Sequence, residues 1–158
     1  MTMKFKIAAI SLSAVLATTL GPLAGFTAHA DDSGGALYSG VNGLRPECGT
    51  IADDPRLSAA AQRHANDMLA NAVNGHLGSD GSLPQARIAE AGYTRASRTG
   101  EIVYWGTGSA ATPNAALDSW MTSPPHRAII LNCGFTAGGF ATAWDGNKMT
   151  AVGDFASL

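Results

Sequence analysis

Three polar segments of the chain each carry one side chain that can bind a metal ion or move a proton. These side chains are His76, Glu101 and His126. Two histidines and one glutamate also form the protein ligand set of some catalytic zinc sites that keep a position open. The sequence has no local His-Glu-x-x-His helix, so the three residues could meet only through the fold.

The surroundings of these residues suggest what each could do. His126 follows Ser123-Pro124, a helix-start signal, so the helix dipole should lower its pKa and favour the neutral ligand form. Glu101 could orient an imidazole through a hydrogen bond or ligate directly. We therefore take His76, Glu101 and His126 as candidate cavity and metal-binding residues, for zinc or another divalent cation.

Catalytic residues remain unassigned at this level. The sequence supplies no obvious nucleophile and no general base distinct from the three candidate ligands, so we favour binding over turnover. His64 lies seven residues after Leu57, on the same apolar helix face. We interpret it as a buried, hydrogen-bonded histidine rather than a ligand.

Helices are expected in the first part of the chain and strands at its end. Apolar spacing predicts helices ending near Pro46, running from Leu57 to Gly75, and covering 113–121. A further helix is expected after Ser82 as N-cap, and His126 is placed in the first turn of a short helix through Ile130.

The strand signals come later in the sequence. Residues 101–105 predict a short strand, and 135–143 with 148–155 predict a hairpin turning at Asp145-Gly146. This order favours an α+β or layered α/β/α domain with a largely antiparallel sheet.

The first thirty residues predict a signal peptide. Lys4 and Lys6 precede an apolar stretch, and Ala28-His29-Ala30 is a small-x-small cleavage site. We expect cleavage after Ala30, a flexible start over 31–35 and one domain over 36–158. The protein is then secreted, extracellular or in the cell envelope, with no stable membrane insertion.

Charge and cysteine content narrow the class of protein. Beyond residue 30 the chain keeps twelve acidic residues against eight basic ones, a formal charge of −4, which argues against nucleic acid as a partner. Cys48 and Cys133 are an even pair in an exported chain, so a disulfide is the default.

An ordered series of short motifs spans nearly all of the sequence after residue 30: Val41-Asn42-Gly43-Leu44-Arg45, 61–68, His76 with 78–81, Arg87-Ile88, 91–93, Gly100-Glu101, Trp120, 123–127 and 138–140. In these motifs and their order, the chain resembles the CAP superfamily, also called the SCP domain, of cysteine-rich secretory, antigen 5 and pathogenesis-related proteins, and within it the bacterial branch.

This resemblance implies an α/β/α sandwich with a central cavity lined by two histidines and two acidic residues. His76, Glu101 and His126 match three of them. Eukaryotic members usually carry a glutamate at the fourth position, where this chain has Ser123, and Ile102 replaces an asparagine.

Three functions remain open at this level. The first is a monomeric, extracellular binding module with a His/Glu-lined cavity, whose ligand is a small apolar or lipid-like molecule or a metal. The second is a metal-dependent extracellular hydrolase using the two histidines and Glu101. The third is a surface interaction protein in which these residues only brace the fold.

Overall fold

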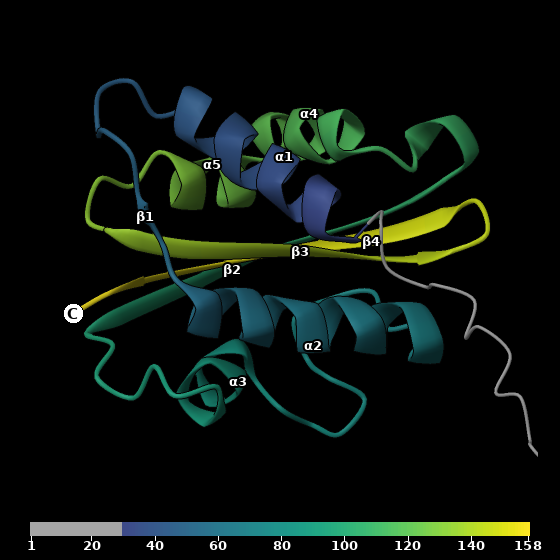
Figure 1. Ribbon diagram of the computed structural model, residues 1–158, viewed down its shortest axis with the longest axis horizontal. Helices are drawn as coiled ribbons and strands as arrows, with labels where there is room; N and C mark the ends of the chain where they lie inside the picture. Colours follow the sequence, from purple (N-terminus) through teal and green to yellow (C-terminus); the bar gives the residue numbers. More distant parts are fainter. Residues whose placement is uncertain (1–29) are drawn as a thin grey trace, which may run out of the picture.

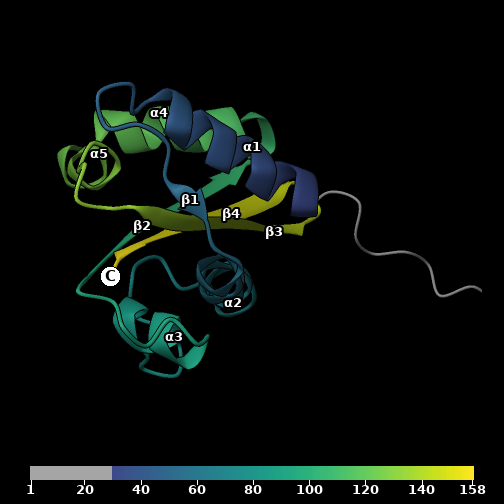
Figure 2. The same cartoon turned by 60° about the vertical axis from the view of Figure 1, so that its left-hand side comes forward.

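The computed structural model describes residues 30–158, which form three layers around one sheet (Figure 1). The predicted signal peptide lies outside the described residues, except for Ala30. Helices α1 (Ala30–Gly43), α4 (Pro113–Thr122) and α5 (Pro124–Ile130) cover one face of the sheet, and α2 (Pro55–Asn71) and α3 (Pro84–Glu90) cover the other. Figure 2 shows the same layers from the side. The expected α/β/α sandwich is confirmed.

The sheet has four strands in the order β1-β3-β4-β2. Their bounds are Ala52–Asp53 for β1, Arg98–Thr107 for β2, Ala137–Asp145 for β3 and Lys148–Ser157 for β4. Strand β4 pairs antiparallel with both β2 and β3, whereas β1 joins β3 in parallel through two residues. The sheet is therefore mixed and largely antiparallel, with β4 at its centre.

Alternating residues of the sheet supply a core on each face. On the side of α1, α4 and α5, the apolar cluster includes Ile102, Phe155 and the fully buried Trp120, whose Nε1 donates to the Val103 carbonyl at 2.9 Å. On the side of α2 and α3, Val103 and Val152 pack with small residues of α2. Each helical layer is therefore held on the sheet by burial of its own apolar cluster.

The helix on the second face approaches the sheet closely because β3 has a glycine there. A Cβ on Gly139 would lie 2.0 Å from the Ser58 nitrogen and 2.3 Å from the Leu57 carbonyl carbon. Helix α2 itself begins at Pro55, after Asp54, whose carboxylate accepts from the Arg56 amide at 2.9 Å. This start signal sets where α2 begins, and its buried apolar residues, among them Ala61 and Ala65, face the sheet.

Two local predictions were wrong by small amounts. The N-cap of α3 is Leu83 rather than Ser82, because the Ser82 backbone closes the preceding loop with Gly78 and Asp80. The hairpin turn is Gly146-Asn147, one residue later than expected, since Asp145 pairs with Lys148. Gly146 has a positive φ of 57°, which suits a tight turn.

Residues 31–35 lie within helix α1, where the sequence analysis expected a flexible start. Helix α1 begins at Ala30, and Gly34 is buried against β3, where an added Cβ would lie 2.9 Å from the Phe140 carbonyl oxygen. The small residues that suggested a flexible segment instead allow the helix to approach the sheet edge.

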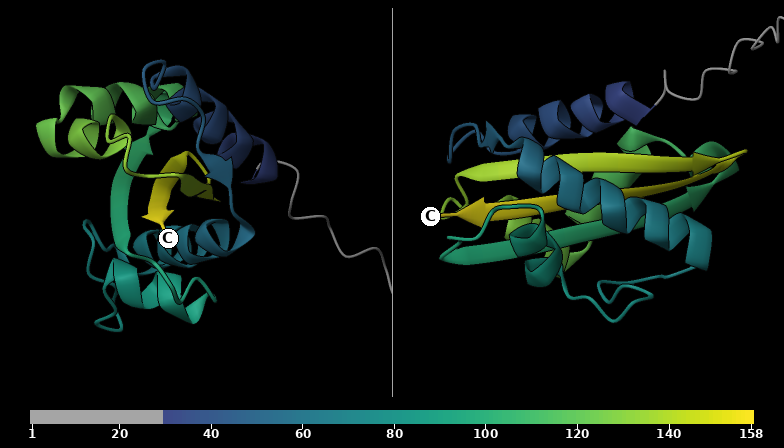
Figure 3. Two further views of the ribbon diagram at one scale, coloured as in Figure 1. Left: turned by 90° about the vertical axis from the view of Figure 1, so that its left-hand side faces the viewer. Right: turned by 60° about the horizontal axis from the view of Figure 1, so that its bottom comes forward.

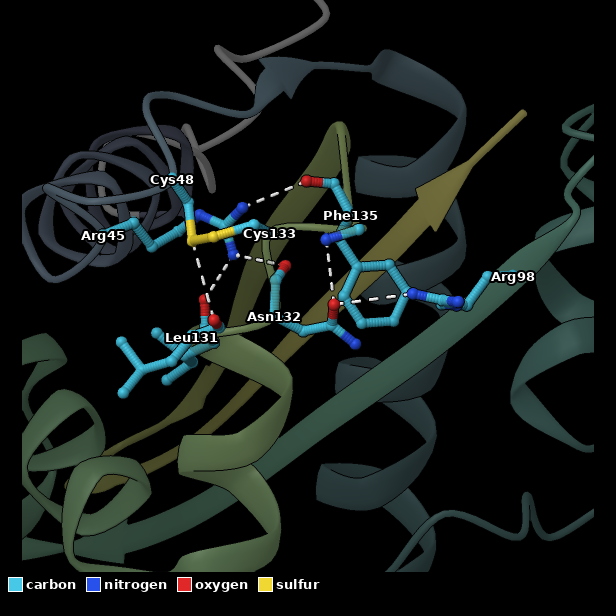
Figure 4. The surroundings of a disulfide bond; sticks show 9 residues. Arg45, Cys48, Arg98, Leu131, Asn132, Cys133 and Phe135 are labelled. Atoms are coloured by element: carbon cyan, nitrogen blue, oxygen red, sulfur yellow. Dashed lines mark hydrogen bonds between the residues drawn. A yellow bond between two sulfur atoms is a disulfide. The ribbon is translucent and has the colours of Figure 1, made fainter.

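Cys48 and Cys133 form the predicted disulfide, which ties the segment after α1 to the loop between α5 and β3 (Figure 4). Arg45 reinforces this link. Its buried guanidinium donates to the carbonyls of Ile130, Asn132 and Phe135, at 3.2 Å for Asn132 and 3.0 Å for Phe135. Within residues 30–158, no helix is long and apolar enough to cross a membrane.

Candidate functional site

The structure brings His76, Glu101 and His126 together at the β2 edge of the sheet. Glu101 lies in β2, His76 in the loop between α2 and α3, and His126 in α5. The left view of Figure 3 shows β2 as an edge strand, with α5 beside it on one face and the α2–α3 segment on the other. The site therefore joins both helical layers across the edge.

Glu101 is buried, and its two carboxylate oxygens have different partners. Oε1 lies 2.8 Å from His76 Nδ1, and Oε2 accepts from Arg87 Nη2 at 2.6 Å. Because a carboxylate can only accept, Nδ1 of His76 carries the hydrogen in this contact. Of the two roles left open for Glu101, the geometry favours orienting an imidazole over direct ligation.

Arg87 holds this arrangement from helix α3. Its side chain is 1% exposed, and besides Glu101 it donates to the carbonyls of Ser82 at 2.8 Å and His76 at 3.0 Å. One guanidinium thus fixes the Glu101 carboxylate and the backbone of the His76 loop together. The sequence analysis includes Arg87 only in the motif Arg87-Ile88 and assigns it no role in the site. An arginine beside Ile88 in a short helix was the available signal.

His76 and His126 face each other. Their ring centroids are 6.3 Å apart with an interplanar angle of 62°. The His76 side chain is 48% exposed, which leaves its other ring nitrogen open to a ligand, whereas His126 is partly buried and its Nδ1 has no hydrogen-bond partner within residues 30–158.

The pKa of His126 is lowered, as expected, but the cause differs. Burial lowers it most, and the charge of His76 lowers it further. Both effects disfavour the imidazolium and keep a neutral imidazole available as a ligand. These two causes are separate from the dipole of the seven-residue helix α5, on which the sequence-based expectation rested.

His64 is fully buried on α2, and its Nε2 lies 2.8 Å from the Gly75 carbonyl oxygen. The interpretation of His64 as a buried, hydrogen-bonded residue is confirmed. Its bond ties α2 to the residue that precedes His76. The same nitrogen is 3.9 Å from Glu101 Oε1, so His64 lies directly behind the site.

Asp154 is a residue of the site that the sequence analysis missed. It is fully buried on β4, directly opposite Glu101 in the β2–β4 register. Burial raises the pKa of Asp154 well above its usual range, and the charge of Glu101 adds to this while Arg87 opposes it. A single acidic residue in the apolar run 149–156 was the signal that could have identified it.

The other features expected at the site are simpler. Ser123 is the junction of α4 and α5 and provides no carboxylate. Within residues 30–158, no three His, Cys, Asp or Glu side chains are arranged to hold a metal ion. A separate groove of about 410 Å³ lies between α1 and α4; its lining includes Gly40, Leu44, Leu117 and Met121.

Comparisons with known proteins agree with this architecture. The sequence model of CAP, the cysteine-rich secretory protein family, matches residues 38–155. No curated protein matches the sequence. An outer surface protein from Borrelia burgdorferi is similar in structure, with a TM-score of 0.71 and 22% identity over 80% of this chain and 92% of that one.

Two longer bacterial proteins share the fold as well. An extracellular SCP-domain protein from Bacillus anthracis has a TM-score of 0.67 and 21% identity over 81% of this chain. A cysteine-rich secretory protein from Staphylococcus aureus has a TM-score of 0.59 and 16% identity over 87% of this chain. This chain covers 41% and 40% of their respective lengths, so the likeness is one of fold.

Proposed function

Because the chain belongs to the CAP, or cysteine-rich secretory protein, family, we propose that it is an exported binding module whose ligand site is the His76–Glu101–His126 cluster. The disulfide and the predicted signal peptide support an extracellular or cell-envelope location. One observation carries the choice of site: Glu101 fixes the tautomer and orientation of a half-exposed imidazole that faces a second imidazole.

The ligand proposed for this cluster is a divalent transition-metal ion such as zinc. Neutral imidazole is a good zinc donor, and a carboxylate bonded to the second ring nitrogen is its usual support. His76 and His126 would hold the ion, and Glu101 would orient His76. Two protein donors leave the remaining ligand positions to water or to a partner molecule, so binding should be exchangeable.

Zinc titration by calorimetry tests this proposal. We expect one site in the wild-type protein, no binding in the His76→Ala/His126→Ala variant, and unchanged binding in Leu77→Ala. Leu77 is a matched control because it is the exposed neighbour of His76 in the same loop. Zinc at one hundred times its Kd should also stabilise the wild-type fold by about 2.7 kcal/mol.

Two outcomes would contradict the proposal. If the double variant binds zinc as the wild type does, the ion is held elsewhere. If the wild type binds no zinc and the double variant only melts at a lower temperature, the histidines brace the fold, as in an interaction protein. Metal-dependent hydrolysis of peptide or cell-wall material, lost in His126→Ala, would support the hydrolase alternative instead.

A second candidate ligand is favoured by the α1–α4 groove. Its apolar lining, from Leu44, Leu117 and Met121, suits a small apolar or lipid-like molecule. Mass spectrometry of organic extracts should find such a ligand in wild-type protein and lose it in Leu117→Gln. Leu131→Gln is the same substitution at a leucine outside this lining, and this variant should retain the ligand.

A further inference from the structure

Asp154 is a buried carboxyl group that lies beside the site. The side chain is fully buried, and neither Oδ1 nor Oδ2 has a hydrogen-bond partner within residues 30–158. An ionised carboxylate in such a place would lose its hydration without compensation, which is among the most costly arrangements in a protein interior. The burial of this carboxyl group must therefore be compensated in another way.

The strand register determines which group faces Asp154. Asp154 and Glu101 are directly opposite each other in the antiparallel β2–β4 pair, so their side chains leave the same face of the sheet with Cβ atoms roughly 4.5–5.5 Å apart. On the other side of β4 its partner is Gly139, which has no side chain and whose backbone lies against the start of α2. Glu101 is thus its polar neighbour within the sheet.

Among the residues that the structure describes, no cation is left to pair with Asp154. Helix α3 contributes Arg87, which already forms an ion pair with Glu101 of β2, and α2 contributes His64, whose Nε2 is bonded to the Gly75 carbonyl. Strand β3 offers only Gly139 at this level. One buried guanidinium compensates one carboxylate, so a second ionised carboxyl would be unmatched.

Glu101 can still accept a hydrogen bond. Each carboxylate oxygen has two lone pairs, and the contacts with His76 and Arg87 use one on each oxygen. A proton on Asp154 would therefore turn an unfavourable pair of acceptors into a donor and an acceptor, as in other carboxyl pairs that share one proton.

We propose that Asp154 is a positioning residue of the site, a buried carboxylic acid that keeps its proton and donates it in a hydrogen bond to Glu101. Glu101 then has three donors, which fix its carboxylate and moderate how strongly it attracts the Nδ1–H of His76. Ser123 has no carboxyl group, so the second acidic side chain of the site is Asp154, which comes from β4. This inference rests on the proposed function only in taking His76 as a ligand-binding residue.

Carbon NMR of the ligand-free protein tests the protonation of Asp154 directly. At pH 7 the Asp154 Cγ signal, assigned by its loss in Asp154→Asn, should have the chemical shift of a carboxylic acid, with the exposed Asp53 as the carboxylate reference. In Glu101→Gln, Asp154 should become the counter-ion of Arg87, and its signal should move to the carboxylate position. A carboxylate shift in the wild type would overturn the proposal.

The Nδ1–H resonance of His76 at pH 8 tests the positioning role. Asp154→Asn keeps a donor and should leave this resonance near its wild-type position, whereas Asp154→Ala should move it downfield because Glu101 then binds His76 more strongly. If Asp154 were ionised, both variants would remove a negative charge and move the resonance upfield. If its role were only structural, both would lower the Tm without moving it.

Thr150→Val is the matched control for a polar loss on the same face of β4. The Thr150 hydroxyl donates to the Ala65 carbonyl at 2.7 Å and has no contact with Glu101 among those described, so the His76 resonance should not move. The wild-type carbon signal, once assigned with Asp154→Asn, decides the protonation even if Glu101→Gln or Asp154→Ala fails to fold. None of these measurements uses a metal, so they succeed or fail independently of zinc binding.

Discussion

Arg87 and Glu101 form a buried ion pair in which Nη2 lies 2.6 Å from Oε2 and both side chains are 1% exposed. The same guanidinium also donates to the backbone carbonyls of His76 and Ser82, two positions of the loop between α2 and α3. A single side chain therefore links α3, β2 and the loop that carries the exposed imidazole. Its removal should affect the stability of the fold and the geometry of the site together.

Arg87→Met should destabilise the protein by about 3–5 kcal/mol, because it leaves the buried Glu101 carboxylate without its cation. Arg63→Met is the matched control. Arg63 likewise forms ion pairs, with Asp80 and Glu90, but all three of these side chains are 43–59% exposed. The loss of stability in Arg63→Met should therefore be at most about 1 kcal/mol. Urea denaturation of both variants measures the difference, and equal losses would contradict the assigned role of Arg87.

His126 should make the protein less stable in mild acid. Because its pKa is lowered in the folded state, the unfolded chain takes up a proton first as the pH falls below about 6.5. Stability should therefore decline from pH 6.5 downward until the folded pKa is passed. In His126→Gln this part of the decline should be absent, as measured by chemical denaturation between pH 8 and pH 5.

Asp154 should act in the opposite direction on the pH scale. Its pKa is raised on folding, so its contribution is fully present below about pH 3.9, the unfolded value, and is lost as the pH rises through the folded pKa. The Asp154→Asn variant should gain stability relative to wild type as the pH is raised above 4. A difference that does not change with pH would show that the pKa of Asp154 is the same in both states.

The disulfide should contribute about 2–5 kcal/mol, since it closes a loop across 85 residues of sequence. The Cys48→Ala/Cys133→Ala variant should remain folded at moderate temperature, because Arg45 still bonds three carbonyls on the far side of the link. Adding Arg45→Met to it should then cost more than Arg45→Met costs in the oxidised wild type. Thermal melts of the four proteins measure this coupling.

Gly139→Ala should be the most damaging of these changes. The added methyl group would overlap the backbone of Leu57 and Ser58, which cannot move without shifting α2 from the sheet. Gly35→Ala is the control, because the Cβ there would have nothing within 4 Å and the helix should gain about 0.5–1 kcal/mol. Circular dichroism during urea unfolding distinguishes the two, and a mild loss at Gly139 would contradict the close contact.

The elements with strong local signals were predictable from the sequence. Apolar spacing and a helix-start proline placed α2, and the candidate residues His76, Glu101 and His126 do converge. The start of α1 was not predictable in the same way, because its Asp-Asp-Ser-Gly-Gly sequence has low helix propensity. It is helical where Gly34 packs against the sheet, a tertiary effect that no local pattern encodes.

The missing parts of the site have a similar cause. The Arg87–Glu101 pair joins residues of different elements, and the facing of Glu101 and Asp154 depends on the register between β2 and β4, two strands that are far apart in the chain. Residue types alone could nominate candidates for such contacts, but not choose between orienting and ligating roles. The choice for Glu101 became possible once both of its oxygens had named partners.

The position of β4 constrains how the domain is made. It is the last element in chain order, yet both long strands on either side depend on it for their hydrogen bonds. Until β4 has been synthesised, neither β2 nor β3 has its main partner, and Glu101 faces no Asp154. Completion of the sheet must therefore await β4, the strand with which both long neighbours pair.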